Sequence, residues 1–226
     1  MLDQYKQPEF VAPSTSLAPT FFGKVMTAFS MAVAVSVLGV WVSFTYFLEA
    51  FIATPALIWV AIIAEFALIL TSRMWSKRKP LNYWLFSAFA FLTGVSITPI
   101  LLVATVAGGI GIVIKALLAT VLMFAAAGII GWTTKKSLEG IGGFLMIALI
   151  GMVITGLIGL FIPWGNQFEM IYSGIGVILF AGYAVYDFNM LKKYPEDSYI
   201  DAAMHLYLDI FNLFIFILRL LLSNRN

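Results

Sequence analysis

The chain has 226 residues, of which 62% are hydrophobic and 11% are charged, and its formal net charge is +2. A soluble domain carries about a quarter charged residues, so this composition excludes one and indicates a polytopic membrane protein with one compact helical domain. The chain has no cysteine and a single histidine, which excludes disulfides, thiolate metal sites and multi-histidine metal centres. The chain has no lysine- and arginine-rich run with interleaved aromatics, so nothing in it suggests a nucleic-acid partner.

The first segment, residues 1–24, holds three prolines among polar residues and has no long apolar run at its start. This pattern is not that of a cleaved signal peptide. We expect a short, poorly ordered cytoplasmic arm over residues 1–24. The transmembrane domain is then expected over residues 25–226, with its first helix as an uncleaved anchor.

Seven apolar segments follow, each close to or above the roughly 20 residues that span a bilayer. They are predicted at about residues 25–48, 51–75, 81–106, 112–132, 141–162, 170–191 and 201–223. Pro99 predicts a kink in the third segment. The expected fold is therefore an all-α membrane protein with seven transmembrane helices.

The basic residues in the links predict the orientation of the chain. They concentrate before the first apolar segment and in the links after the second, fourth and sixth apolar segments. The opposite links carry almost no basic residues. The amino terminus and the basic links are therefore expected in the cytoplasm. Arg219 and Arg225, near the carboxyl end, run against this rule and leave a re-entrant last segment as an alternative.

The last segment is apolar enough to cross a bilayer, yet it carries His205, Asp209, Asn212 and Arg219 on one stripe of a helix. An ionisable side chain at membrane depth costs about 3 kcal/mol or more, so this stripe is expected to face the bundle interior or a watery cavity. The alternative is a helix-helix interface of satisfied polar groups. For His205, near the helix start, a solvated side chain is favoured over a proton relay.

Asp187 and Asp209, in the last two segments, are expected at nearly the same depth. Asp187 lies about 8 Å along the helix from Lys192, and Asp209 about 12 Å from Asp201. The short link makes the two helices antiparallel neighbours, and facing each other keeps both carboxyls out of lipid. Such a pair tends to share one proton, and losing it leaves repelling charges. The pair is thus a candidate pH switch, and its oxygens suit a transient calcium ion rather than a stored one.

Three charged positions, Glu65, Arg73 and Arg219, are assigned roles. Glu65 and Arg219 are expected to form an ion pair that closes the outer half of a polar pathway, with a static structural pair as the alternative. Arg73 lies one turn inside the basic link after the second segment. It is a candidate partner of the aspartates, with a snorkelling anchor as the alternative.

The chain resembles the Bax inhibitor-1 family, also called the transmembrane Bax inhibitor motif family. The residues that carry this resemblance are Tyr186-Asp187 and the run 206–214, LYLDIFNLF, supported by GVSITP at 94–99 and GWTTKK at 131–136. The resemblance covers the chain from the first helix to the end, and the short arm looks like that of a bacterial member. It implies seven helices, with the last one central and wrapped by the other six.

The resemblance also implies a pH-sensitive calcium leak channel, with Asp187 and Asp209 as the pH sensor and Glu65 and Arg219 as the outer latch. An arginine at the cytoplasmic end of the second helix contacts the aspartates in bacterial relatives. The matching position here is Ser76. Arg73, one turn earlier, or Lys79 is expected to substitute for it.

Three other functions stay open at this point. The two aspartates also match the arrangement of an intramembrane aspartyl protease, but Tyr207-Leu208-Asp209 departs from the Gly-x-Gly-Asp of those enzymes. A membrane regulator that transports nothing and binds a partner membrane protein is the second, and a proton-coupled cation exchanger is the third.

We expect no enzyme activity and no cofactor, with calcium as the transported ion. A monomer in the bacterial inner membrane is expected, interacting with lipid, calcium and protons.

Overall fold

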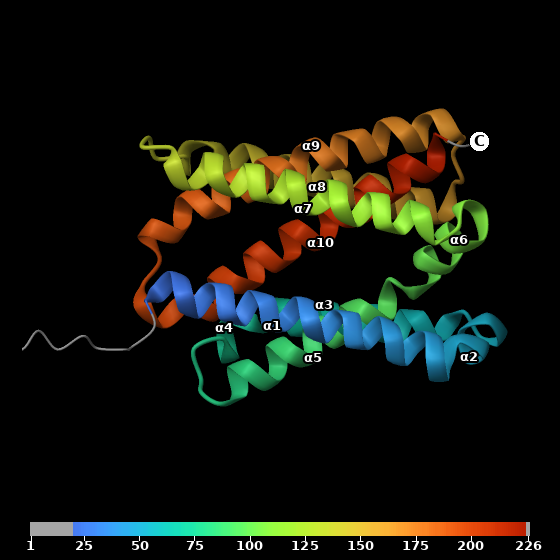
Figure 1. Ribbon diagram of the computed structural model, residues 1–226, viewed down its shortest axis with the longest axis horizontal. Helices are drawn as coiled ribbons and strands as arrows, with labels where there is room; N and C mark the ends of the chain where they lie inside the picture. The colour runs from blue at the N-terminus through green and yellow to red at the C-terminus, as the bar shows by residue number, and fades with distance from the viewer. Residues whose placement is uncertain (1–19, 225–226) are drawn as a thin grey trace, which may run out of the picture.

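The computed structural model describes residues 20–224, which form helices, turns and short links without any β-strand (Figure 1). Residues 1–19, which make up most of the predicted arm, lie outside the described residues, as does Arg225. Helix α1 begins at Phe21, so the last part of the predicted arm is helical. The Thr20 hydroxyl accepts a hydrogen bond from the Gly23 amide at 3.2 Å and caps this helix start.

The first apolar segment forms one long rod. Helix α1 (Phe21–Val42) continues through a π-helical turn, η1 (Ser43–Phe47), into α2 (Leu48–Ala53). The rod ends just before Pro55, because a proline inside a helix lacks the amide donor and clashes with the preceding turn. This first helix is longer than predicted at both ends.

The second apolar segment is broken and shorter than predicted. Helix α3 (Ala56–Leu70) is separated from α4 (Ser72–Trp75) by Thr71, whose hydroxyl donates to the Ala67 carbonyl at 2.7 Å. A helix of 15 residues rises about 22 Å, which is less than the roughly 30 Å hydrocarbon core of a bilayer.

The remaining helices follow the predicted order. They are α5 (Leu81–Ser96), α6 (Thr98–Gly108), α7 (Ile110–Thr133), α8 (Glu139–Phe161), α9 (Asn166–Met190) and α10 (Tyr199–Ser223), with 3-10 turns η2 (Leu191–Lys193) and η3 (Glu196–Ser198) between the last two. The predicted kink near Pro99 is the break between α5 and α6 at Ile97.

Six helices of the described chain are long and apolar enough to cross a membrane, and α3 is the shorter apolar helix beside them. The chain is thus a multi-pass helical protein, and a seventh crossing by α3 stays a prediction. Helix α10 is a single unbroken helix of 25 residues, about 37 Å long. That length suits a full crossing better than the re-entrant alternative.

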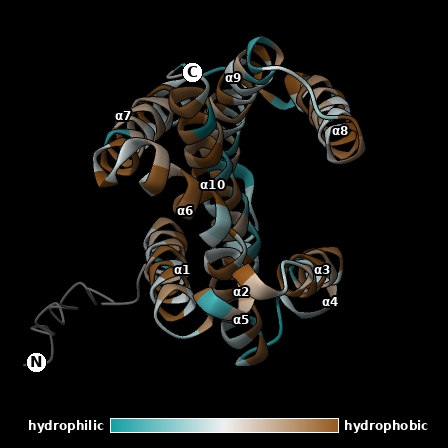
Figure 2. Cartoon of the chain, turned by 90° about the vertical axis from the view of Figure 1, so that its right-hand side faces the viewer, coloured by the Kyte–Doolittle hydropathy of each residue, from teal (hydrophilic) through white to brown (hydrophobic). Residues whose placement is uncertain are grey.

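Helix α10 runs obliquely between two groups of helices, with α7, α8 and α9 on one side and α1, α3 and α5 on the other (Figures 1 and 2). It packs against α9, α1, α7, α5 and α6, whereas α8 packs on α9 and α3 packs on α5. Its side chains Leu206, Tyr207, Leu213 and Leu218 are at most 1% exposed. The core of the molecule therefore lies along α10.

The crossing of α1 and α5 depends on two glycines, and this gives a first testable prediction. A Cβ on Gly94 would overlap the Ser36 carbonyl, and a Cβ on Gly39 would overlap that of Phe91. Gly94→Ala is expected to destabilise the fold by about 1–3 kcal/mol through overpacking. Gly174→Ala, in α9, meets nothing within 4 Å and is the control. Thermal unfolding in detergent measures both, and equal melting temperatures would contradict the expectation.

Candidate functional site

Asp187 and Asp209 come together at the interface of α9 and α10. The short link through η2 and η3 returns the chain, so the last turn of α9 faces the middle of α10. Asp187 is 4% exposed and Asp209 is 3% exposed. Their carboxyl groups lie within hydrogen-bonding reach of each other. The structure thus places both acids in the interior and in contact, and their role as a pH sensor stays a prediction.

The contact between these carboxyls needs a proton to be favourable. The Oδ2 atom of Asp209 is buried and has no hydrogen-bond partner among the described residues. Two ionised carboxylates accept only and cannot satisfy each other, whereas one protonated carboxyl donates to its neighbour. A proton shared by the pair would let one carboxyl donate a hydrogen bond to the other, and this sharing stays a prediction.

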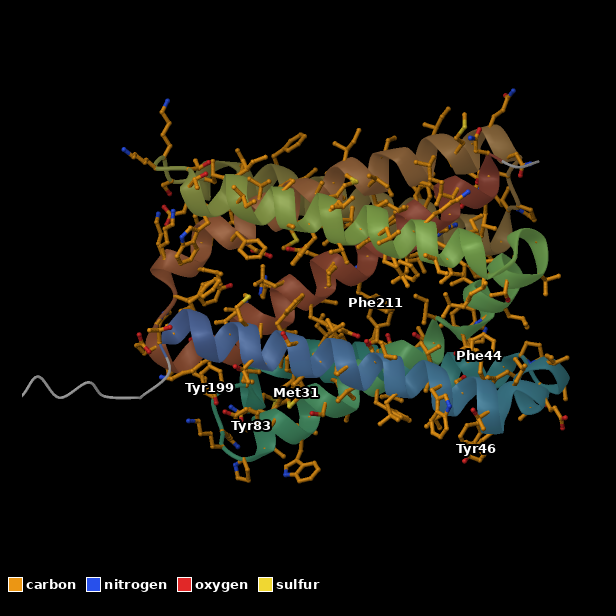
Figure 3. The ribbon with its side chains drawn as sticks, in the orientation of Figure 1. Met31, Phe44, Tyr46, Tyr83, Tyr199 and Phe211 are labelled. Carbon is orange, nitrogen blue, oxygen red and sulfur yellow. The ribbon has the colours of Figure 1, made fainter. Side chains whose placement is uncertain are left out.

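The two aspartates line a cavity of about 390 Å³, which we call the aspartate cavity. Its walls come from α3, α5, α8, α9 and α10, so it joins the two helix groups. Its polar lining among the described residues is Glu65, Thr93, Tyr183, Asp187, His205, Asp209 and Asn212, and the rest is apolar. Phe211, seen on α10 in Figure 3, belongs to that apolar part. No lysine or arginine of residues 20–224 lines it.

The nearest nitrogen base to the aspartates is His205. Its Nδ1 lies 3.5 Å from Asp187 Oδ2, and its side chain is 53% exposed while that of Asp187 is 5% exposed. The sequence favoured a solvated histidine over a relay. The side chain is indeed half-exposed, but it also contacts the acid pair, because residues four apart share a helix face.

Arg73 does not take the place predicted for it. It is exposed, and among the described residues it forms no ion pair with either aspartate. Lys79, the other candidate, lies over the ring of Tyr199 with its Nζ 5.4 Å from the ring centroid. The Tyr199 hydroxyl in turn donates to that of Tyr83 at 2.9 Å (Figure 3). Lys79 therefore contacts the start of α10 instead of reaching the acids.

The predicted ion pair between Glu65 and Arg219 is wrong for this structure. Arg219 pairs with Glu169, its Nε donating to Oε1 at 2.7 Å and its Nη2 to Oε2 at 3.2 Å. Glu169 lies in the first turn of α9, and antiparallel packing brings that turn to the last turns of α10. Trp164 Nε1 also donates to Glu169, at 2.8 Å, and the Arg219 guanidinium lies over the Tyr172 ring.

Glu65 lies elsewhere, in the wall of the aspartate cavity. It is half-buried near the Ser96 hydroxyl, and its Oε1 has no hydrogen-bond partner among the described residues. Sequence reasoning missed Glu169 because it was assigned to a link. The available signal was an acid in the first helical turn, opposite an arginine near the end of an antiparallel neighbour.

Comparison with known proteins agrees with this architecture. A family model described as inhibitor of apoptosis-promoting Bax1 matches residues 18–226. A Campylobacter jejuni protein is 30% identical over 98% of this chain and 96% of its own length. A Helicobacter pylori protein is 39% identical over 72% of this chain and 70% of its own. Inner membrane protein YbhL of Escherichia coli is 33% identical over 73% of this chain and 74% of its own. The chain therefore belongs to the Bax inhibitor-1 family of multi-pass membrane proteins.

Proposed function

We propose that this protein is a passive calcium leak channel of the bacterial inner membrane, opened when the Asp187–Asp209 pair loses its shared proton. The observation that carries the proposal is the contact of these two buried carboxyls in a cavity whose described lining contains no lysine or arginine. Without such a permanent cation, the repulsion is relieved by a proton on the pair, by a protonated His205 beside Asp187 or by a passing metal ion. The name of the Escherichia coli relative supports the choice of membrane.

The pair couples protonation to the distance between two helices. With one proton bound, a hydrogen bond between Asp187 and Asp209 ties α9 to α10. Without it, two negative charges at contact distance in a low-dielectric interior push those helices apart. Because α10 lies between the two helix groups and α9 belongs to one of them, the separation of α9 from α10 is the proposed step that widens the path. Flux should therefore rise as pH rises.

Calcium is the cargo of this path and not a stored ion. It prefers six to eight oxygen ligands, and within the described residues no group of three or more histidine or acidic side chains is placed to hold a metal. Asp187 and Asp209 therefore offer a transient stop. Glu65, in the same cavity, is proposed as a second stop, and Arg219 as a closing residue that acts through Glu169. The proposal includes seven crossings around α10 and a cytoplasmic amino terminus.

The direct test is calcium entry into proteoliposomes loaded with a calcium indicator, measured at a series of pH values against empty liposomes. We expect a passive flux that increases toward alkaline pH and follows the calcium gradient alone. An exchanger would instead need an imposed proton gradient. Protein-containing vesicles that are no more permeable than empty ones at any pH would contradict the channel.

A further inference from the structure

A second cavity lies next to the aspartate cavity, at the end of the bundle that carries the link between α9 and α10. Its volume is about 240 Å³, and its described lining is Ser72, Arg73, Ser76, Lys77, Tyr194, Asp201, Met204 and His205. This lining is polar, unlike the largely apolar walls of the aspartate cavity. His205 is the one described residue that lines both cavities.

The His205 side chain is held at the boundary from two sides. On the inner side its Nδ1 lies 3.5 Å from the Asp187 carboxyl. On the outer side its ring meets the Tyr194 ring edge-on, with centroids 6.4 Å apart. The imidazole is 53% exposed and the Asp187 side chain only 5%. Because His205 contacts the acid and also lines the second cavity, its ring lies between the two.

We propose that the second cavity is the entrance to the aspartate cavity and that the His205 side chain is the barrier between them. The proposal rests on the proposed function, in that an ion bound for the aspartates would pass this point. The entrance is polar, since the hydroxyls of Ser72 and Ser76 and the Asp201 carboxylate offer oxygen atoms there beside the cationic Arg73 and Lys77. Displacing one ring joins two volumes that already adjoin.

The charged neighbours explain why the ring rests where it does. Asp187 lies on α9, and Asp201 lies on α10, the helix that carries His205 itself. Arg73 and Lys77 lie across the second cavity. Asp187 attracts the imidazole toward α9, and the cations do not compete for Asp187, with which neither forms an ion pair among the described residues. The barrier is thus a side chain rather than a helix, so its size can be changed without moving the backbone.

The cysteine-free chain provides the test, because a single introduced cysteine is the only thiol. Leu208→Cys places that thiol in the wall of the aspartate cavity. In oriented membrane vesicles, its modification by a water-soluble methanethiosulfonate is measured with His205, His205→Ala and His205→Phe. We expect the alanine variant to react about tenfold faster or more, a change of about 1.4 kcal/mol in the barrier, and the phenylalanine variant to react more slowly than the parent.

The matched control is Ser72→Cys, whose thiol lies in the second cavity, outside the barrier. Its reaction rate should not depend on the residue at position 205. A Leu208→Cys rate that is the same with histidine, alanine and phenylalanine would overturn the proposal. So would equal acceleration of both thiols, which would indicate general loosening.

Calcium flux separates this inference from the proposed function. If the wild-type protein conducts calcium, His205→Ala should raise the flux and His205→Phe should lower it. If the wild-type protein conducts none, the channel fails while the labelling rates still decide whether His205 separates the two cavities. Flux that falls in the alanine variant together with faster labelling would contradict His205 as a barrier on the ion path.

Discussion

Asp209→Asn is expected to hold calcium flux at its acidic-pH level across the whole pH range. The asparagine amide is close in size to a protonated carboxyl, carries no charge at any pH and donates a hydrogen bond to the Asp187 carboxylate. It therefore imitates the pair with its proton permanently in place. A hydrogen bond to a charged group contributes about 1.5–3 kcal/mol. At alkaline pH the variant should conduct about 10- to 100-fold less than the wild type.

The measurement is calcium entry into proteoliposomes at matched protein density, with wild type and variant titrated in parallel. Asp197→Asn is the control, since Asp197 is an exposed acid at the same end of the molecule that pairs with Lys77 at 3.1 Å. It should keep the wild-type pH response. An Asp209→Asn channel that still opens with rising pH would remove the aspartate pair from the mechanism.

The pairing of the two aspartates followed from the sequence because it needs only local geometry. A short link makes neighbouring helices antiparallel, and the rise of a helix then gives the depth of each residue. The same arithmetic failed for Arg219. It treats helices as parallel to one another, whereas α10 crosses the bundle obliquely (Figure 1), so Glu65 lies beside the aspartate cavity and away from the end of α10.

The remaining differences also have physical causes. The break at Thr71 divides a segment whose apolar composition is continuous, and a hydroxyl bonded to its own helix backbone leaves little trace in hydropathy. The sequence predicted an arginine or a lysine as the partner of the aspartates, yet these side chains remain at the surface around α4 and α5. The histidine four residues before Asp209 was the available signal, because it shares a helix face with that acid.

Glu169→Gln is expected to lower the melting temperature in detergent, whereas Glu65→Gln is expected to leave it unchanged or raise it. The first substitution removes the charge that compensates the partly buried Arg219, whose side chain is 32% exposed, and spoils a two-pronged hydrogen bond. Partial exposure reduces the cost below that of a fully buried pair, to about 1–3 kcal/mol. The second substitution neutralises a carboxyl with an unpartnered buried oxygen, which costs free energy while it stays charged.

The chemical change is the same at both sites, so their difference isolates the partner of Arg219. In a double-mutant cycle, Arg219→Gln should couple to Glu169→Gln and be additive with Glu65→Gln. The opposite pattern, with coupling to Glu65, would restore the outer ion pair inferred from the family resemblance. Coupling to Glu169 instead places the closing interaction between α9 and α10, the helices that the aspartates join. If the aspartates lose their shared proton, the repulsion between them is opposed by the Glu169–Arg219 ion pair at the far end of the same interface. The two helices would then separate near the aspartates while the Glu169 end stays in contact.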